Sequence, residues 1–216
     1  MEAVAEKIAP DAVANSTGNG NGAVRNGHTA PPTLTRDELI AALYREEGKA
    51  EIIDGRIVRF DMTGDEPGRA AKSIVVALTL WERATRPPGR SYTDGVAFLA
   101  NLPNRQSFAP DASYYTGPPA GMKFLPDPPV FAVEVRSEGD YGPAPEREMR
   151  AKRTDYFATT TEVVWDVDLL DAEIIVRKFT KAGGSQNPVA VYKRGETADA
   201  EPAVPGFTMP VDDLFE

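Results

Sequence analysis

The carboxylate of Glu134 stands in the middle of an otherwise apolar segment, VFAVEVRS (130–137). If this segment is a strand, Phe131, Val133 and Val135 share one face, and Glu134 lies on the other face. A carboxylate in a buried strand is costly unless a cationic partner, a metal ion or a water-filled cleft accompanies it. The segment therefore predicts a buried strand that carries either an ion-paired acid or a functional one.

Two further acids lie on segments that we also expect to be strands. Asp111 lies near the start of FAPDASYY (108–115), and Glu51 precedes the turn of KAEIIDGRIVRF (49–60). Carboxylate oxygens are the ligands that Mg²⁺ and Mn²⁺ prefer, and such an ion stabilises charge on a phosphate and activates a bound water. Lys152, on the helix predicted after the Glu134 strand, is the cation that would orient this water. If they share one ion, Asp111 and Glu134 should converge on one cleft at the edge of the sheet.

The composition restricts the kinds of site that the chain can build. With 216 residues, of which 41% are hydrophobic and 26% charged, it is typical of a globular protein of one domain plus a tail. It has no cysteine, which excludes disulfides and thiolate catalysis and is consistent with a reducing cytoplasm, where we expect the protein. Its only histidine is His28, so a metal site would use oxygen ligands. We find no signal peptide and no segment apolar enough to span a membrane.

The formal net charge of −9 argues against nucleic-acid binding driven by overall charge. Basic residues do cluster in EREMRAKR (146–153) and in DGRIVRF (54–60). Such clusters form either a local basic cleft or a solvated face on which arginines alternate with glutamates. The charge pattern leaves both interpretations open.

The chain is organised as a tail followed by one domain. Residues 1–33 are rich in Gly, Asn and Pro and lack an apolar period, so we expect a flexible tail, with the domain over 34–216. Helical spacing and start signals predict helices over 35–47, 67–85 and 146–159. Alternating or continuous apolar runs predict strands in 49–60 (a hairpin turned at Asp54-Gly55), 95–102, 108–115, 130–137, 161–168, 172–179 and 188–194.

Between residues 33 and 179 the motifs EIIDG, PDASYY, FAVEVRS and K-x-x-x-Y ahead of VVWDVD occur in this order. In this combination the chain resembles the Uma family of restriction-endonuclease-like proteins, within the PD-(D/E)-x-K nuclease superfamily. The resemblance implies an α/β fold with a mixed sheet flanked by helices, and a Mg²⁺-dependent (or Mn²⁺-dependent) DNA endonuclease. Carried over residue by residue, it implies Glu51, Asp111 and Glu134 as metal ligands, with Asp111, Glu134 and Lys152 as the catalytic residues.

The chain departs from the family pattern at three places. Arg136 stands two residues after Glu134, where the simplest superfamily pattern has its lysine. Residues 69–71, ahead of the long helix, contain no histidine, and Thr159 to Thr161 replace a Gly-Val pair. A lysine that has moved to the helix, as at Lys152, is consistent with the family.

Each candidate also has a purely structural interpretation. Asp111 could be a strand-start residue, Glu51 a solvated residue beside the hairpin, Glu134 an ion-pair partner of Arg136 or Arg153, and Lys152 a residue whose stem covers an apolar stripe. 

The sequence also predicts roles for four other residues of the same region. Asp166 and Asp168 share a strand face and are candidates for extra acids, although we expect Asp168 at a loop end. Trp165 and Tyr156 are predicted to be core residues rather than base-stacking groups.

Two functions of different class follow from the sequence. The first is a Mg²⁺-dependent endonuclease that hydrolyses phosphodiester bonds in DNA, with a homodimer as the arrangement that supplies two sites for two strands. The alternative is a binding or regulatory module that keeps the nuclease fold without hydrolysis. The retained acids favour the enzyme, whereas the acidic net charge and the absent histidine favour the module.

Overall fold

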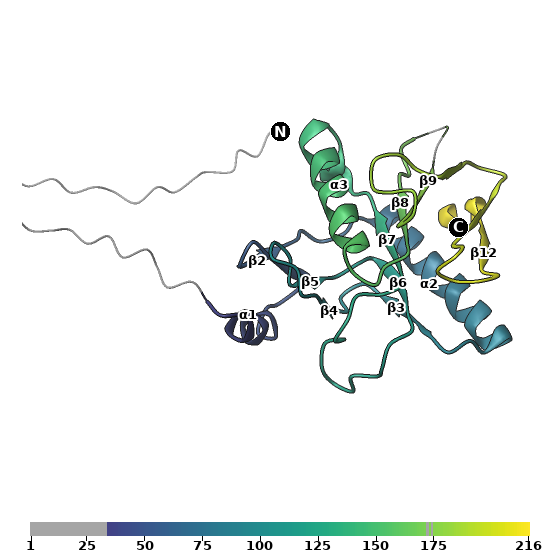
Figure 1. Cartoon of the computed structure of the whole chain (residues 1–216). Helices are drawn as coiled ribbons and strands as arrows, with labels where there is room; N and C mark the ends of the chain where they lie inside the picture. The colour runs from purple at the N-terminus through teal and green to yellow at the C-terminus, as the bar shows by residue number, and fades with distance from the viewer. Residues whose placement is uncertain (1–33, 172, 174) are drawn as a thin grey trace, which may run out of the picture. The chain divides into compact units, whose positions relative to one another are not determined.

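The central element of the computed structural model, which describes residues 34–171, 173 and 175–216, is a six-stranded sheet (Figure 1). Its strand order is β10-β9-β8-β7-β6-β3; β7 and β8 run parallel and all other neighbours run antiparallel. The predicted tail, residues 1–33, lies outside the described part of the chain. The strands of this sheet are β3 (Arg90–Thr93), β6 (Ala112–Tyr115), β7 (Phe131–Val135), β8 (Val163–Val167), β9 (Val176–Thr180) and β10 (Ala190–Tyr192).

The first described elements are a short helix and a hairpin. Helix α1 (Arg36–Leu43) begins with a capping box in which Thr35 and Glu38 satisfy each other's backbone N–H groups, as the sequence predicts. Strands β1 (Ala50–Ile53) and β2 (Arg56–Arg59) then pair around the two-residue loop Asp54-Gly55. Both loop residues have positive φ, 49° and 69°, which is the conformation that a tight hairpin of this length requires.

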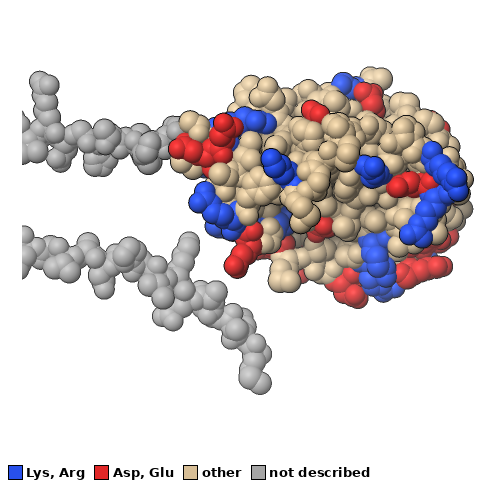
Figure 2. Space-filling view, turned by 90° about the horizontal axis from the view of Figure 1, so that it is seen from below, with Lys and Arg blue, Asp and Glu red and all other residues tan. Residues whose placement is uncertain are grey.

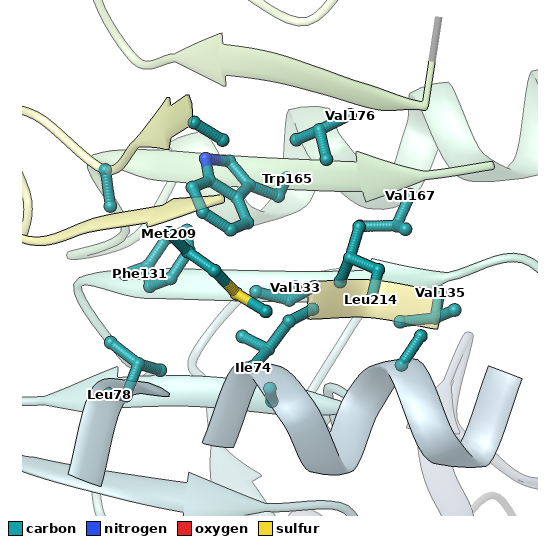
Figure 3. Packing of buried hydrophobic residues seen from close by; sticks show 14 of the residues in the cluster. Ile74, Leu78, Phe131, Val133, Val135, Trp165, Val167, Val176, Met209 and Leu214 are labelled. Atoms are coloured by element: carbon teal, nitrogen blue, oxygen red, sulfur yellow. The ribbon is translucent and has the colours of Figure 1, made fainter. Parts of the chain in front are cut away.

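The long helix α2 (Asp65–Thr85) covers one face of the sheet. Its buried residues, Ala70, Ala71, Ile74 and Leu78, follow the helical period and belong to one core cluster with alternate residues of β6 to β9. Figure 3 shows Ile74 and Leu78 on the side of the sheet that carries Val133. Full burial of a side chain such as Leu78 contributes about 1.5–3 kcal/mol. The face of β7 predicted to carry Phe131, Val133 and Val135 is the face that packs here.

Helix α3 (Pro143–Phe157) lies on the opposite face of the sheet (Figure 1). Its buried residues Tyr156 and Phe157 pack with Ala132 of β7 and Val164 of β8 in a second, smaller core cluster. The short strands β4 (Phe98–Leu99) and β5 (Ser107–Phe108) pair with each other, and Phe108 joins this cluster. Because Glu134 alternates with Val133 and Val135, it faces this second layer.

The C-terminal segment was not predicted in detail. Strands β11 (Thr197–Asp199) and β12 (Thr208–Pro210) form a hairpin, and the 3₁₀ helix η2 (Val211–Phe215) follows. Phe207, Met209 and Leu214 from this segment complete the core beside α2. Short strands interrupted by proline and glycine carry little periodic signal, which is why the sequence did not reveal them.

Strand β3 was also missed, because its sequence RSYT is brief and half-exposed, and the predicted strands 95–102 and 108–115 proved shorter than expected. A further 3₁₀ turn, η1 (Glu138–Asp140), connects β7 to α3. The predicted fold class, an α/β domain with a mixed sheet flanked by helices, is confirmed. In the described part of the chain we find no helix with the length and apolar character needed to cross a membrane.

Candidate active site

The candidate site lies where β1, β6, β7 and α3 meet, on the α3 side of the sheet. Asp111 is fixed beside β7, because its backbone N–H donates to the Val133 carbonyl at 3.0 Å and its Oδ2 accepts the Val135 N–H at 2.7 Å. Glu134 lies between these two residues of β7, so both predicted acids belong to one site. Glu134 lies on the interior strand β7 and Asp111 directly precedes the interior strand β6, so the expectation of a position at the edge of the sheet was wrong.

Glu134 has a lysine and a tyrosine as partners. Lys152 Nζ donates to its Oε2 and the Tyr156 hydroxyl donates to its Oε1, each at 2.7 Å. Burial raises the pKa of Glu134, the charge of Lys152 opposes this shift, and the nearby Asp111 adds to it. Burial and the charge of Glu134 also raise the pKa of Tyr156, which therefore stays a hydrogen-bond donor. The apolar strand tolerates this carboxylate because two donors satisfy it.

Lys152 bridges two acids. Its Nζ lies 2.7 Å from Glu134 Oε2 and 3.0 Å from Glu51 Oε1. Burial alone would lower the pKa of Lys152, but the two carboxylates outweigh it and raise the pKa. An ammonium group has three donors, so these contacts leave one donor for a ligand.

Glu51 is completely buried and its oxygens are fully engaged. Oε1 accepts the Ala109 N–H at 3.0 Å as well as Lys152, and Oε2 accepts the guanidinium of Arg105. Arg105 is held in turn by Asp155, with 2.8 Å between Nε and Oδ2. Although burial opposes it, the charges of Lys152 and Arg105 lower the pKa of Glu51. Glu51 is thus not solvated beside the hairpin, and its contacts anchor Lys152.

Asp111 is paired with a second lysine that precedes β1. Lys49 Nζ lies 2.5 Å from Asp111 Oδ1 and 2.9 Å from Asp94 Oδ1. Burial disfavours the charged lysine, but Asp111 and Glu134 together raise its pKa well above the ordinary value. Asp111 and Glu134 are therefore each paired with one lysine.

Asp111, Glu134 and Glu51 differ in their capacity to bind a hard divalent cation. No group of three or more acidic or histidine side chains in the described residues is arranged to hold a metal ion unaided, because lysines stand between the carboxylates. Mg²⁺ commonly uses only one or two carboxylates, with water and phosphate oxygens completing its shell. Asp111 and Glu134 each accept one hydrogen bond per oxygen and so keep lone pairs for an ion, whereas Glu51 has the least capacity.

A second cluster of charges, here called the arginine cluster, lies beside the site and consists of the buried residues Arg136, Arg153 and Asp166 with the partly exposed Glu146. Asp166 accepts from Arg136 at 2.7 and 2.8 Å and from Arg153 at 2.8 Å. Glu146 joins both arginines at 2.8 and 3.2 Å. The structural alternative for Glu134, an ion pair with either of these arginines, is therefore wrong.

The remaining acid, Asp168, lies just after β8 and accepts the N–H of Leu170 at 3.1 Å and the hydroxyl of Tyr141 at 2.9 Å. It occupies the loop end that the sequence predicts. Trp165 is 1% exposed and lies in the main core, and Tyr156 packs against Phe108, so both are core residues as expected. Tyr156 additionally places its hydroxyl in the site.

Sequence reasoning missed Lys49 and Arg105 as partners of the site. The spacing of Lys49 and Glu51, two residues apart around the start of β1, puts both on one strand face and could have indicated Lys49. Arg105 lies in the loop between β4 and β5 and is joined to Ile53 by a single bridge. No local pattern marks such a residue, because its role depends on contacts with β1 and α3.

Comparison with known proteins agrees with this architecture. Residues 37–212 match the model of the Uma2 family, described as putative restriction endonuclease, and the chain belongs to this family. It is also similar in structure to a protein from Anabaena variabilis ATCC 29413, described as a putative nuclease belonging to DUF820. That match has a TM-score of 0.62 and 14% identity and covers 82% of this chain and 97% of the other, so it shows a shared fold. No curated protein sequence matches the chain.

Proposed function

We propose that this chain is a Mg²⁺-dependent DNA endonuclease in which Asp111 and Glu134 hold the ion and Lys152 acts beside them. The observation that carries the proposal is the convergence of these three residues. Asp111 is fixed by hydrogen bonds to the residues on either side of Glu134, and Lys152 contacts Glu134 directly. Membership of the Uma2 family, described as putative restriction endonuclease, supports a phosphodiester substrate.

The ion would neutralise charge on the scissile phosphate and make a bound water more acidic. The protein's own residues orient the reactants. The free donor of Lys152 can bind the attacking water or a phosphate oxygen, while Glu51, itself held by Arg105, keeps the ammonium group in place. The Tyr156 hydroxyl donates to Glu134 Oε1 and helps to orient this carboxylate. Hydrolysis forms a bond from the water oxygen to phosphorus and breaks the bond to the leaving oxygen, which takes up a proton.

The surface charge is compatible with local rather than global attraction to DNA. On the face seen in Figure 2, Lys and Arg side chains are scattered among Asp and Glu side chains and form no continuous basic band. At the site the cations Lys49, Lys152 and Arg105 offset the acids. We expect affinity to depend on the ion and on a few phosphate contacts, with a homodimer supplying two sites for duplex cleavage.

The test is nicking of supercoiled plasmid DNA with and without Mg²⁺, together with thermal unfolding in the same buffers. Wild-type protein should nick only with Mg²⁺ and should gain stability from the ion. Glu134→Gln should lose nicking by at least about a hundredfold, because a ligand of the ion that stabilises charge on the reacting phosphate is weakened. Glu162→Gln is the matched control, since the Glu162 side chain is 45% exposed and only distantly paired with Lys181 at 3.9 Å.

Two results would contradict the proposal. Equal nicking by wild type and Glu134→Gln would place the activity elsewhere. Absence of nicking by the wild type, with retained DNA binding, would instead identify the binding module that the acidic net charge favours.

A further inference from the structure

A second lysine, Lys49, pairs with Asp111, the proposed ion ligand that has no ion pair with Lys152. It lies two residues before Glu51, and the Phe60 N–H donates to its carbonyl at 3.0 Å, so the hairpin fixes its backbone. Its side chain is 17% exposed and contacts both Asp94 and Asp111. A solvated surface lysine would not be held by two acids at once.

The two lysines differ in what holds them. Lys152 is anchored by Glu51, which is completely buried and carries Arg105 and a backbone N–H as further partners. Lys49 is anchored by Asp94, whose side chain is 38% exposed. Lys49 also lines a surface pocket together with Tyr44 and Phe124. Of the two ammonium groups, that of Lys49 is therefore the one that pairs with an acid exposed at the surface.

A cation bound to Asp111 weakens the ion pair between Asp111 and Lys49. A divalent ion on Asp111 repels the ammonium and competes for the same oxygens. Asp94 can still hold the ammonium, and a phosphate group brings negative charge within reach of its free donor. The long, flexible stem of lysine permits such a shift without movement of the backbone.

We propose, on the basis of the nuclease function proposed above, that Lys49 occupies Asp111 in the ion-free protein and contacts a phosphate oxygen of the nucleic acid once the ion is bound. Asp94 keeps Lys49 at the site during this exchange. Lys49 thus competes with the ion for Asp111 and also contacts the substrate. Its removal should therefore raise the affinity for Mg²⁺ and lower the affinity for DNA.

The experiment measures Mg²⁺ binding and DNA binding separately for two variants. Mg²⁺ is titrated calorimetrically without DNA, and a fluorescein-labelled DNA duplex is titrated by anisotropy in Ca²⁺, which limits cleavage. Lys49→Met should bind Mg²⁺ about threefold more tightly, because the competitor is gone, and DNA about tenfold more weakly, because a charged hydrogen bond is lost. Asp94→Asn should shift Mg²⁺ binding the other way, because Lys49 then pairs with Asp111 alone.

The controls separate a local effect from misfolding. Lys181→Met removes an exposed lysine outside the site and should change neither titration. Lys49→Arg keeps the cation and should retain most DNA binding. Circular dichroism confirms folding before each titration, and Asp94→Asn keeps the proposal testable if Lys49→Met does not fold.

The outcomes distinguish this proposal from the nuclease function. Normal Mg²⁺ and DNA titrations for Lys49→Met, with nicking by the wild type, would overturn the role of Lys49 alone. Lys49-dependent DNA binding without nicking by the wild type would overturn hydrolysis and retain the phosphate contact. A wild type that binds neither Mg²⁺ nor DNA would overturn both.

Discussion

Two acids on adjacent strands, Glu134 on β7 and Asp166 on β8, have very different surroundings. Glu134 and Asp166 are register partners on these parallel strands and project from the same side of the sheet. Asp166 is 1% exposed and is surrounded by guanidinium groups of the arginine cluster, one of which binds it through two hydrogen bonds. The Glu134 side chain is 16% exposed, is bound by one ammonium and one hydroxyl, and has its pKa raised by burial.

The difference indicates how one sheet face carries both a structural ion cluster and a reactive site. The planar guanidinium group of arginine binds both oxygens of a carboxylate, stays charged and fixes the orientation of the carboxylate, as at Asp166. Lysine binds as a point charge and leaves lone pairs free, as at Glu134. A carboxylate in the first setting stabilises the fold, whereas one in the second can exchange its partner for a cation.

The largest effect that this comparison predicts is at Asp166. Asp166→Asn leaves two buried arginines with only Glu146 as a shared acid, so unfolding in urea should show a loss of about 3–5 kcal/mol. Glu162→Gln again serves as control, because its carboxylate is exposed. A loss below about 1 kcal/mol would show that the arginine cluster does not stabilise the fold as its geometry suggests.

An intermediate effect is expected when the fork of Arg136 is replaced and its charge is kept. Burial opposes the charge of Arg136, but hydrogen bonds to Asp166 contribute most to raising its pKa. Arg136→Lys keeps one of three hydrogen bonds and should cost about 1–2 kcal/mol in the same urea titration. Arg136→Met, which removes the charge as well, should cost more. Equal losses in both variants would show that charge contributes nothing beyond packing.

The smallest effect on stability is expected at Glu134. Because burial makes the charged form unfavourable, Glu134→Gln should leave the free energy of unfolding unchanged or slightly higher at neutral pH without Mg²⁺. The amide oxygen can accept from Lys152 while the amide N–H donates to the Tyr156 hydroxyl, and Lys152 keeps Glu51. Thermal unfolding measures this directly. A loss as large as that at Asp166→Asn would mean that Glu134 is a structural ion-pair partner of Lys152.

The pH dependence of stability tests whether the pKa of Glu134 is raised in the folded protein. A carboxyl group whose folded-state pKa is raised binds its proton more tightly when folded. Wild-type stability relative to Glu134→Gln should therefore fall as the pH rises through the ordinary value of 4.5 and the raised folded value, and should then level off. Unfolding of both proteins across this range without divalent ions gives the difference. A difference that moves in the opposite direction would contradict the raised pKa.

The sequence alone determined much of the framework. The capping box at Thr35, the hairpin at Asp54-Gly55 and the helical period of α2 are local patterns, and each forms where it was expected. Alternation along β7 placed Glu134 opposite the main core, and the order of four short motifs indicated the family. Such features depend on residues close together in the chain, so their signals survive in the sequence.

Only the tertiary structure decided how the charges pair. The chain has many acids and bases of similar spacing, and the partner of each depends on which elements meet across the sheet. Lys49 reaches Asp111 over 62 residues and Arg105 reaches Glu51 over 54. Arg136, two residues from Glu134, binds Asp166 instead, because packing of β7, β8 and α3 brings Asp166 within reach of its fork. An ion pair forms between groups that are close in space, and their separation along the chain does not reveal which groups will meet.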